Sequence, residues 1–466
     1  MADIRDYRGK RVHMIGIGGS SMSGLTDFLL DEGCVLTGSD KAESHYVEAL
    51  REKGIRVSIG QKAENVRGAD LVIFSAAIHP DNPERAEAAR LGIPEMERSV
   101  LLGELMRGYR QRICVSGTHG KTTTSGMIGQ ALTDCGLNPS VHIGGQLDTL
   151  GGGTRLGARD AFVAEACEYH SSFLELSPTI AVVLNIDGDH YDYYKDLDDY
   201  ELAFRDFLDR MPPDGIAVGY GEDARVMRRF LRCGKRCVTY GWSRNNDFAP
   251  DGLTFDDFGC PSFDVLERGV RAAHVALRIS GDFSVLNALA AFAAARQAGA
   301  EPEAVARTLS RFAGVHRRFE LTGVIDGVRM YHDYGHNPAE MRAAISVAKK
   351  QKANRVWAVM QPHTFSRVKN FFDEYLTCTK AADITLVTDI CAAREKAPGD
   401  IHSGMLVDGM KARGVNAVWT PSFDDTEAYL RAHWKPGDLV LTMGCGDINL
   451  LNEQMAKHGD SNSDRK

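Results

Sequence analysis

The sequence has no long hydrophobic run of the kind that spans a membrane. No stretch of about eighteen or more apolar residues occurs, although a helix that crosses a bilayer needs about 20. Residues 1–10 are polar and charged, whereas a secretory signal carries an apolar segment near the N-terminus. We therefore expect a cytoplasmic protein without membrane insertion.

The sequence also has little that would form a zinc site or a disulfide framework. Its 10 cysteines are scattered singly, and the closest pair, Cys233 and Cys237, has no second pair or nearby histidine to complete a metal site. We interpret the cysteines as reduced thiols that mostly fill the core. With only 15 prolines, 43% hydrophobic residues and 25% charged residues, the composition is that of a globular enzyme.

Positive charge is not in excess either. The formal net charge is -8, which argues against nonspecific binding to nucleic acid. An anionic ligand must therefore be held by specific groups. The length of 466 residues is too great for one core, because domains cluster near ~100–200 residues, and we expect three domains.

Short apolar runs alternate with helical patterns, which predicts parallel α/β units. The strands predicted in the first unit are 11–17, 34–38, 55–59 and 71–75. The second unit has strands at 112–116, 161–166, 179–185 and 215–219 and helices at 283–298 and 301–312. The third has strands at 323–325, 328–332, 355–360, 384–388 and 438–443. We place the domains at 1–109, 110–313 and 314–466, and expect 459–466 to be disordered.

A glycine-rich loop follows the first predicted strand. Residues 16–24 read GIGGSSMSG, and they precede a helix whose free N–H groups and dipole favour a diphosphate. The loop is an imperfect dinucleotide-binding motif, because Ser21 replaces the third glycine of G-x-G-x-x-G. Asp40, at the end of the second strand, is placed to bond a ribose hydroxyl. A plain tight turn is the alternative interpretation.

A second glycine loop carries more chemistry. Residues 116–123 read SGTHGKTT, follow an apolar run and open a helix. Backbone donors of such a loop cradle phosphate oxygens, Lys121 can reach the terminal phosphates, and the Thr122 hydroxyl can bind Mg2+. The loop is shorter than G-x-x-x-x-G-K-[ST], because its leading glycine is Gly117. The alternative is a glycine turn with a solvated lysine.

Acidic side chains interrupt the strand-like segments that follow. Glu165 and Glu168 interrupt one segment, and Asp187, Asp189 and His190 follow another. Carboxylates at the ends of parallel strands lie where α/β enzymes place their chemistry. A metal is needed there, because two like unit charges about 4 Å apart repel by about 4 kcal/mol at an effective dielectric of about 20. His190 is either a metal ligand or a satisfied structural histidine.

Three polar clusters flank apolar strands of the third unit, at Arg317–Glu320, His332–Pro338 and Gln361–Arg367. This position predicts connecting loops rather than one solvated helix face. Arginine suits phosphate and carboxylate recognition, because its planar fork makes two parallel charge-assisted bonds. For any one of these arginines, a surface salt bridge is the alternative.

These motifs, in this order, resemble the Mur ligase family over residues 16–449. The resemblance implies an α/β protein of three domains: a Rossmann-like N-terminal UDP-sugar domain, a central P-loop-type ATPase domain with a mainly parallel sheet, and a Rossmann-like C-terminal domain that brings the amino acid. Within the family the motifs are most similar to the alanine-adding branch. The absence of lysine between Lys195 and Lys235 agrees, because related branches place a carbamylated lysine there.

The implied reaction belongs to peptidoglycan precursor synthesis. The resemblance implies that an amide would form between L-alanine and the lactyl carboxylate of UDP-N-acetylmuramate, through an acyl phosphate made with ATP. The expected cofactors are ATP and Mg2+, and the expected partners are UDP-N-acetylmuramate, L-alanine and ATP, without nucleic acid. The chain would act as a monomer or a homodimer.

The resemblance also implies roles for individual residues. The catalytic residues would be Lys121, Glu165, His190, Arg318 and Asp333. The residues that bind ATP would be Gly117, Thr118, His119, Gly120, Lys121, Thr122, Thr123, Asn287, Arg318 and Asp333. Those that bind the UDP-sugar would be Gly16, Gly18, Gly19, Ser20, Met22, Ser23, Asp40 and Ser75. The amino acid would contact Tyr334, His336, His363 and Arg367, and Mg2+ would contact Thr122, Glu165 and His190.

Three other functions stay open. A ligase of the same family that recycles cell-wall tripeptide onto the muramyl sugar would share the domain plan. An NAD-dependent dehydrogenase would use the first glycine loop, but it would leave the second loop and Glu165 without a task. An inactive regulatory scaffold is disfavoured, because Lys121, Glu165, His190 and Asp333 are all present.

Overall fold

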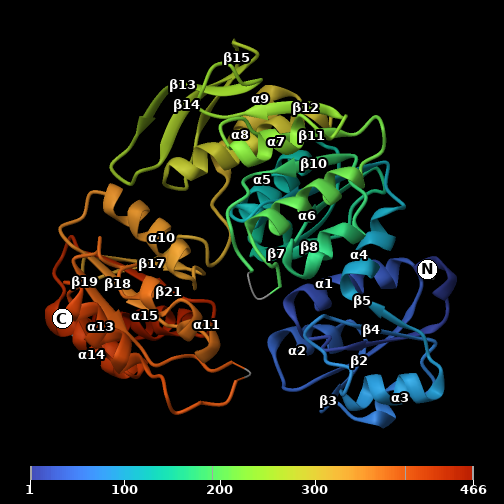
Figure 1. The fold of residues 1–466 in the computed structure, drawn as a ribbon, viewed down its shortest axis with the longest axis horizontal. Helices are drawn as coiled ribbons and strands as arrows, with labels where there is room; N and C mark the ends of the chain where they lie inside the picture. Colours follow the sequence, from blue (N-terminus) through green and yellow to red (C-terminus); the bar gives the residue numbers. More distant parts are fainter. Residues whose placement is uncertain (1–2, 191–192, 394, 464–466) are drawn as a thin grey trace. The chain divides into compact units, whose positions relative to one another are not determined.

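The computed structural model of the chain describes residues 3–190, 193–393 and 395–463. Its strands form three mainly parallel sheets of five, ten and six strands, and helices connect many of the strands along the chain (Figure 1). The predicted α/β class is therefore confirmed. The chain forms two compact units: unit 1 comprises Met1–Thr254, Ser262–Arg278 and Asp282–Ala313, and unit 2 comprises Phe255–Pro261, Ile279–Gly281 and Gly314–Lys466.

The first sheet is parallel throughout and has the Rossmann-type order β3-β2-β1-β4-β5. The four strands predicted here all form, whereas the sequence pattern does not predict β5. The elements are η1 (Ile4–Tyr7), β1 (Arg11–Ile15), α1 (Ser20–Asp31), β2 (Val35–Asp40), α2 (His45–Glu52), β3 (Arg56–Ile59), η2 (Ala63–Val66), β4 (Leu71–Phe74), α3 (Pro83–Leu91), β5 (Glu95–Glu97) and α4 (Arg98–Met106).

The second sheet has the order β15-β14-β13-β12-β11-β10-β6-β9-β7-β8. Its elements are β6 (Gln111–Ser116), α5 (Lys121–Asp134), β7 (Ser140–Leu147), η3 (Asp148–Leu150), β8 (Gly152–Arg155), β9 (Ala161–Glu165), η4 (Tyr169–Glu175), β10 (Ile180–Val183), α6 (Leu197–Asp209), β11 (Ile216–Tyr220), α7 (Ala224–Phe230), β12 (Arg236–Tyr240), β13 (Phe248–Phe255), β14 (Pro261–Glu267), β15 (Val270–Ala276), α8 (Asp282–Gln297) and α9 (Pro302–Arg311). Strand β6 lies between β10 and β9 and is parallel to both. The loops that follow these three strands therefore meet at one edge of the sheet.

The third sheet has the order β16-β17-β21-β18-β19-β20, and only β16 pairs antiparallel. Its elements are β16 (Glu320–Ile325), β17 (Val328–Asp333), α10 (Pro338–Lys350), β18 (Val356–Met360), α11 (Phe365–Asn370), α12 (Phe372–Tyr375), β19 (Ile384–Val387), α13 (Ser403–Ala412), β20 (Ala417–Trp419), α14 (Phe423–His433), β21 (Leu439–Met443) and α15 (Asn449–Ser463). Helix α15 extends to Ser463, residues 464–466 lie outside the described residues, and the disorder expected for 459–466 stays a prediction.

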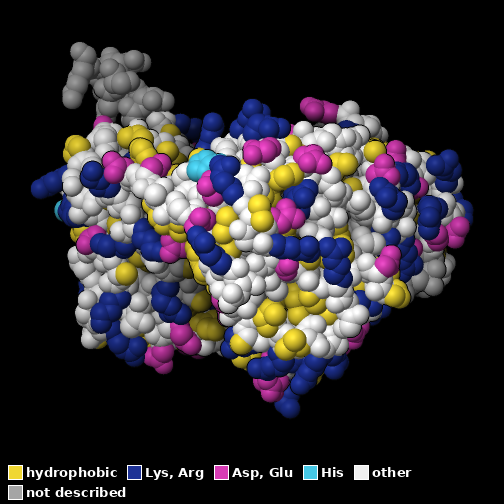
Figure 2. All heavy atoms as spheres, turned by 90° about the horizontal axis from the view of Figure 1, so that it is seen from above, with side chains coloured by type: hydrophobic (Ala, Val, Ile, Leu, Met, Phe, Trp, Pro, Cys, Tyr) yellow, Lys and Arg dark blue, Asp and Glu magenta, His cyan; other side chains and the backbone are white. Residues whose placement is uncertain are grey.

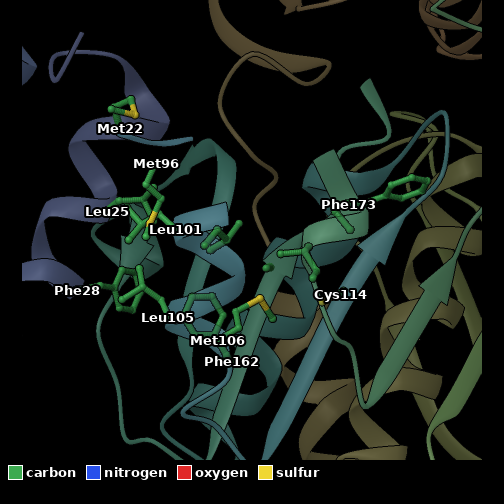
Figure 3. Close-up of a cluster of buried hydrophobic side chains, with 14 of the residues drawn as sticks. Met22, Leu25, Phe28, Met96, Leu101, Leu105, Met106, Cys114, Phe162 and Phe173 are labelled. Atoms are coloured by element: carbon green, nitrogen blue, oxygen red, sulfur yellow. The ribbon is translucent and has the colours of Figure 1, made fainter. Parts of the chain in front are cut away.

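Unit 1 has a hydrophobic core that continues from the first sheet into the second (Figure 3). The rings of Phe28, on α1, and Phe162, on β9, stack with their centroids 5.1 Å apart. Tyr109 meets the edge of Phe162 at 4.9 Å. Because protein interiors are close-packed, this shared core holds the first sheet in a defined position against the second.

Unit 2 is built from three stretches of chain, two of which come from the region of β13–β15. The N–H of Lys352 donates to the carbonyl oxygen of Asp257 at 3.4 Å, and the two side chains pair at 3.5 Å. The side-chain amide of Gln351 donates to the Ser280 hydroxyl at 3.4 Å. Both short stretches are therefore anchored at the C-terminal end of α10.

The surface carries charges of both signs. On the face drawn in Figure 2, Lys and Arg side chains are interspersed with Asp and Glu, and hydrophobic side chains gather in small groups between them. In the part of the chain that the structure describes, no helix is long and apolar enough to cross a bilayer.

Substituting Phe28 by alanine should destabilise unit 1, because the ring is 2% exposed and stacks on Phe162. Truncation of a buried phenylalanine costs about 3–5 kcal/mol, and the free energy of unfolding in a urea titration should fall by that amount. The matched control is Leu231→Ala, whose side chain is 83% exposed and whose loss should change the free energy by less than about 0.5 kcal/mol. A Phe28→Ala protein as stable as this control would contradict the shared core.

Candidate functional site

The second glycine loop connects β6 to α5 in a conformation that needs glycine. Gly117 has φ 135° and Gly120 has φ 86°. A Cβ at Gly120 would also lie 2.6 Å from Oδ1 of Asn287. Two of the predicted ATP-binding residues thus touch, one from the loop and one from α8. The N–H groups of the first turn of α5, which includes Lys121, Thr122 and Thr123, have no partner within the helix and suit an anion.

The ammonium group of Lys121 lies inside this loop. Its Nζ donates to the carbonyl oxygens of Gly117 (2.6 Å) and Thr118 (3.1 Å) and pairs with Oε1 of Glu168 at 2.9 Å. The two side chains are only 13% and 1% exposed. Burial alone would lower the pKa of Lys121, but the negative charge of Glu168, with a contribution from Glu165, raises it above its usual range. Lys121 is therefore a fixed cation at the start of α5.

Glu165, at the end of β9, faces the next residue of the loop. The Thr122 hydroxyl donates to Oε2 of Glu165 at 2.9 Å, and the N–H of Gly144 donates to the same oxygen at 2.9 Å. A Cβ at Gly144 would lie 2.9 Å from that oxygen, so β7 approaches it closely because residue 144 has no side chain. The structure thus brings together two of the three residues predicted to bind Mg2+.

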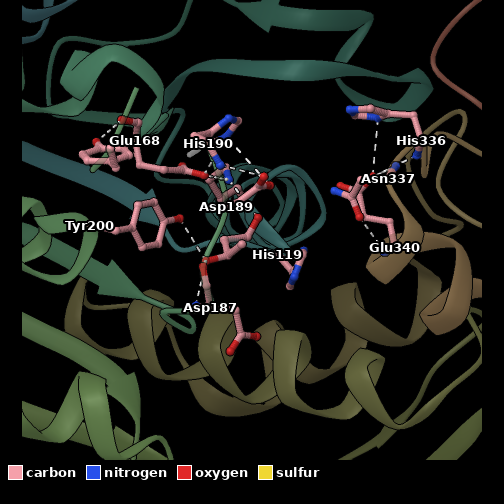
Figure 4. Close-up of polar contacts among 12 residues, drawn as sticks. His119, Glu168, Asp187, Asp189, His190, Tyr200, His336, Asn337 and Glu340 are labelled. Atoms are coloured by element: carbon pink, nitrogen blue, oxygen red, sulfur yellow. Dashed lines mark hydrogen bonds and ion pairs between the residues drawn. The ribbon is translucent and has the colours of Figure 1, made fainter. Parts of the chain in front are cut away.

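Glu168 lies beside the imidazole of His190 (Figure 4) and contacts the ammonium group of Lys121, although the sequence analysis named it only as an acidic group without a specific role. Its Oε1 is 2.9 Å from Lys121 Nζ and 3.5 Å from His190 Nε2. Burial alone would raise the pKa of Glu168, but Lys121 and His190 lower it. For His190, burial alone would lower the pKa, and the contacts with Glu168 and Asp189 raise it. The available signal was the position of Glu168, three residues after Glu165 at the same sheet edge.

Hydrogen bonds tie the loop after β6 to the segment after β10 (Figure 4). The Thr118 hydroxyl donates to the carbonyl oxygen of Asp187 at 2.7 Å and lies 2.9 Å from the Tyr200 hydroxyl. The N–H of His119 donates to Oδ1 of Asn185 at 2.9 Å, and the Asn185 amide returns a bond to the His119 carbonyl oxygen at 3.1 Å. Thr118 and His119 therefore position the acidic segment, and their contact with ATP stays a prediction.

The first glycine loop is held by the end of β2. The N–H groups of Gly16 and Ile17 both donate to the carbonyl oxygen of Ser39, at 2.8 and 3.0 Å. The N–H of Gly18 donates to Oδ2 of Asp40 at 2.8 Å. Asp40, predicted to bond a ribose, thus reaches the loop and already shapes its backbone.

The remaining predicted contacts of the UDP-sugar lie around the start of α1. Gly19 is the N-cap and Ser20 the first residue of this helix. Met22 is 3% exposed and packs in the core (Figure 3), so only its backbone is available to a ligand. The Ser23 hydroxyl is buried and donates to the carbonyl oxygen of Ser20 at 3.1 Å. Ser75 lies in the turn after β4, the strand beside β1.

In unit 2 the end of β17 gathers three predicted residues. Asp333 accepts hydrogen bonds from the N–H groups of Phe319 (2.9 Å) and Gly335 (2.7 Å). Burial raises the pKa of Asp333, and the charge of Arg318 opposes this shift. The Arg318 guanidinium lies 5.1 Å from the centre of the Tyr334 ring, within the range of a cation–π contact.

The predicted amino-acid contacts also lie together in unit 2. The rings of His336 and His363 are 6.2 Å apart between centroids. Nη1 of Arg367 lies 3.1 Å from Nδ1 of His363, which must accept because arginine only donates. The Tyr375 hydroxyl donates to the carbonyl oxygen of His336 at 2.6 Å and fixes the backbone there.

The oxygen donors in unit 1 fit a magnesium ion better than a zinc ion. No group of three or more His, Cys, Asp or Glu side chains able to hold a metal lies among the described residues. Mg2+ usually takes one or two carboxylates and completes its shell with water and substrate phosphates. Thr122 and Glu165 offer such oxygens, and Oε2 of Glu168 is buried without a hydrogen-bond partner in the described part of the chain.

Comparison with known proteins identifies the family. Residues 11–110 match the "Mur ligase family, catalytic domain", residues 115–295 the "Mur ligase middle domain" and residues 317–446 the "Mur ligase, glutamate ligase domain". The chain belongs to the Mur ligase family. The resemblance carried by the glycine loops and acidic motifs is thus confirmed.

Curated relatives of this Mur ligase align over nearly their whole length. The UDP-N-acetylmuramate--L-alanine ligase of Caldanaerobacter subterraneus subsp. tengcongensis is 43% identical over 445 residues, which are 96% of this chain and 97% of the relative. The protein of the same name from Acetivibrio thermocellus is 41% identical over 449 residues, 96% of each chain.

Solved structures share the three-domain architecture. The UDP-N-acetylmuramate-alanine ligase of Thermotoga maritima has a TM-score of 0.82 and 26% identity, over 97% of this Mur ligase and 100% of that chain. A murein peptide ligase from Psychrobacter arcticus has a TM-score of 0.73 over 96% and 98% of the two chains; at 24% identity this likeness concerns the fold alone. The predicted arrangement of three α/β domains is therefore confirmed.

His332, on β17 of this Mur ligase, is held neutral. It is 1% exposed, Nε of Arg317 lies 3.1 Å from its Nε2, and its Nδ1 lies 3.0 Å from the Thr442 hydroxyl. Because Arg317 only donates, Nε2 must accept and the ring proton sits on Nδ1. Burial and the charge of Arg317 lower the pKa of His332 from 6.5 to about 3.

We expect acid to destabilise unit 2 through His332. Its folded pKa is depressed, so below about pH 6.5 only the unfolded chain binds the proton, and stability falls as the pH drops toward 3. At pH 5 this loss is about 2 kcal/mol. In urea titrations, the free energy of unfolding of the parent should therefore fall between pH 7.5 and pH 5.0. For His332→Gln, which cannot titrate, this fall should be smaller by about 2 kcal/mol. An equal pH dependence in both proteins would contradict the assignment.

Proposed function

We propose that this Mur ligase joins L-alanine to the lactyl carboxylate of UDP-N-acetylmuramate, with conversion of ATP to ADP and phosphate. The observation that carries the proposal is the fixed cation of Lys121 in a phosphate loop that has Glu165 and Glu168 at its edge. Support also comes from relatives that are 43% and 41% identical over 96% of the chain and are named for this activity.

The reaction needs a cationic loop because both reacting groups are anions. At about 4 Å and an effective dielectric of about 20, two unit charges repel by about 4 kcal/mol. The ammonium of Lys121 and the N–H groups that start α5 offset this repulsion where the γ-phosphate would lie. An oxygen of the muramyl carboxylate then attacks the γ-phosphorus, and ADP leaves.

The product of that step is a mixed anhydride, which turns an unreactive carboxylate into an electrophile. The amine of L-alanine attacks its carbonyl carbon, a tetrahedral intermediate forms, and inorganic phosphate leaves as the amide is completed. The amine loses a proton in this step. No redox partner is required, so a nicotinamide cofactor has no task in this scheme.

Mg2+ would be held by Thr122, Glu165 and His190, and we add Glu168 because its Oε2 has no hydrogen-bond partner among the described residues. When bound, the ion supplies charge neutralisation on the phosphate oxygens. The residues themselves orient one another: Glu165 fixes the Thr122 hydroxyl, and Glu168 holds both Lys121 and His190.

We assign each substrate to one of the loops described above. The first glycine loop with Asp40 would take the UDP diphosphate and ribose. In unit 2, Arg318 and Asp333 would face the nucleotide, and the charged fork of Arg367 would bind the carboxylate of alanine, with Tyr334, His336 and His363 around it.

Phosphate release should require both UDP-N-acetylmuramate and L-alanine. We would measure it with ATP and Mg2+ against a panel of L-alanine, glycine, L-serine and the cell-wall tripeptide. Release should be highest with L-alanine. Equal rates with the tripeptide would move the protein to the recycling reaction and leave the ligase chemistry intact. Release that needs neither the sugar nor an amino acid would overturn the proposal.

Lys121→Met should lower kcat by at least about 100-fold, because it removes the fixed cation from the loop. The single change leaves Glu168 buried without its partner, so Lys121→Met/Glu168→Gln serves as the control for folding. The double variant should keep its thermal midpoint within about 3 °C and still lack turnover. Undiminished turnover in a folded Lys121→Met protein is the result that defeats the assignment.

A further inference from the structure

Strand β7 lies where α1 of the first sheet packs against the second sheet (Figure 1). Gly24 of α1 approaches β8 so closely that a Cβ there would overlap the Thr154 hydroxyl. Thr154 Oγ1 in turn lies 3.0 Å from Nδ1 of His142, on β7. His142 is 4% exposed, so its ring is enclosed in this junction.

Three alternate residues of β7 make contacts with different parts of unit 1. His142 Nε2 lies 2.9 Å from the Ser21 hydroxyl, in the first turn of α1. The N–H of Gly144 binds Glu165 at 2.9 Å, and the Gln146 amide donates to the hydroxyl of a tyrosine on α2 at 2.7 Å. Two residues of a strand span about 6.7 Å. One short, hydrogen-bonded strand therefore links the first glycine loop to the carboxylate at the phosphate loop.

The hydrogen bonds at His142 join Ser21 of α1 to Thr154 of β8. Nη1 of Arg98 lies 3.2 Å from the Ser21 hydroxyl oxygen and can only donate to it. Nε2 of His142 shares one hydrogen bond with the Ser21 hydroxyl and Nδ1 shares one with the Thr154 hydroxyl, and the tautomer decides which atom donates in each. Burial and the nearby Arg98 lower the pKa of His142 to about 3, so the ring is neutral and carries one proton.

Ser21 occupies the place of the third glycine in the dinucleotide-binding motif, so the chain of bonds ends inside the predicted diphosphate site. The N–H groups of the first helical turn are the ones that an anion uses. Rotation of this turn would move those donors away from a diphosphate. A residue that fixes Ser21 thus sets the geometry of the donors without touching the ligand.

We propose that His142 is a positioning residue for the nucleoside diphosphate. Through Ser21 it fixes the first turn of α1 against β7, the strand whose Gly144 N–H also bonds to Glu165. The proposal rests on the proposed function only in taking the first glycine loop as the diphosphate site. His142 lies on β7 of the second sheet and Ser21 on α1, the helix between β1 and β2 of the first sheet, so the assignment concerns the junction between the two and not a further ligand contact.

The test is direct binding of UDP and of ADP, measured by calorimetry on the full chain. His142→Phe fills the space but cannot hydrogen-bond to Ser21, and the Kd for UDP should rise about tenfold. His142→Gln offers an acceptor and a donor and should restore the Kd to within about twofold. The Kd for ADP should stay within about twofold in both variants, because the phosphate loop keeps its own bonds. His274→Phe, at an exposed histidine, is the matched control.

A second variant guards against the possibility that the buried His142→Phe substitution impairs folding. Ser21→Ala removes only the hydroxyl from the other end of the bond and should weaken UDP binding to the same extent. Ser21→Ala combined with His142→Phe should add no further loss, because both changes break one chain. A purely structural role would weaken ADP and UDP binding alike and would not be rescued by glutamine.

The outcomes separate this inference from the proposed function. Equal UDP binding by the parent, His142→Phe and Ser21→Ala would overturn the positioning role and leave the ligase proposal standing. Loss of ADP and UDP binding together in both variants would also overturn it. If the parent chain itself does not bind UDP, the assignment of the first loop fails, and the proposed function fails with it.

Discussion

The buried ion pair between Lys121 and Glu168 is the contact on which the candidate site depends. A carboxylate that is 1% exposed costs several kcal/mol to desolvate unless a cation and hydrogen bonds compensate. Lys121 compensates only because the carbonyl oxygens of Gly117 and Thr118 hold its ammonium in place. A phosphate that binds Lys121 competes with Glu168 for the same charge. When a phosphate binds Lys121, the Glu168 carboxylate is therefore freed to pair with a different cation.

The order of the strands explains how distant residues reach this pair. Because β6 lies between β10 and β9, the loops that follow all three open at the same edge. The bond from Thr118 to Asp187 spans 69 residues of sequence, and the bond from Lys121 to Glu168 spans 47. The chemistry is thus assembled by sheet topology, while the short glycine loop only provides its cationic part.

The sequence predicts well what is local and periodic. Strand β18 is apolar throughout, β6 contains the apolar run Ile113–Val115, and the glycine loop that ends at Lys121 has a fixed spacing. Strands β7 and β8 escape prediction, because residues 140–155 are rich in glycine and show no strict alternation. The sequence marks Glu168 only as an acidic group at a strand end, and its partners, like the role of His142, escape prediction for another reason. The side chains of Glu168 and His142 are buried, and His142 meets Ser21 across 121 residues of sequence. Such contacts depend on how the chain packs and cannot be inferred from the spacing of residues in the sequence.

The composition of unit 2 has a consequence for how such proteins can evolve. Because Phe255–Pro261 and Ile279–Gly281 belong to it, the chain passes between the units at 254/255, 261/262, 278/279, 281/282 and 313/314. A genetic exchange that replaced everything after residue 313 would transfer only part of unit 2 and leave behind Asp257 and Ser280, the partners of Lys352 and Gln351. Recombination that keeps these contacts must therefore carry the chain from Phe255 onward, so the heritable module is larger than the segment after residue 313.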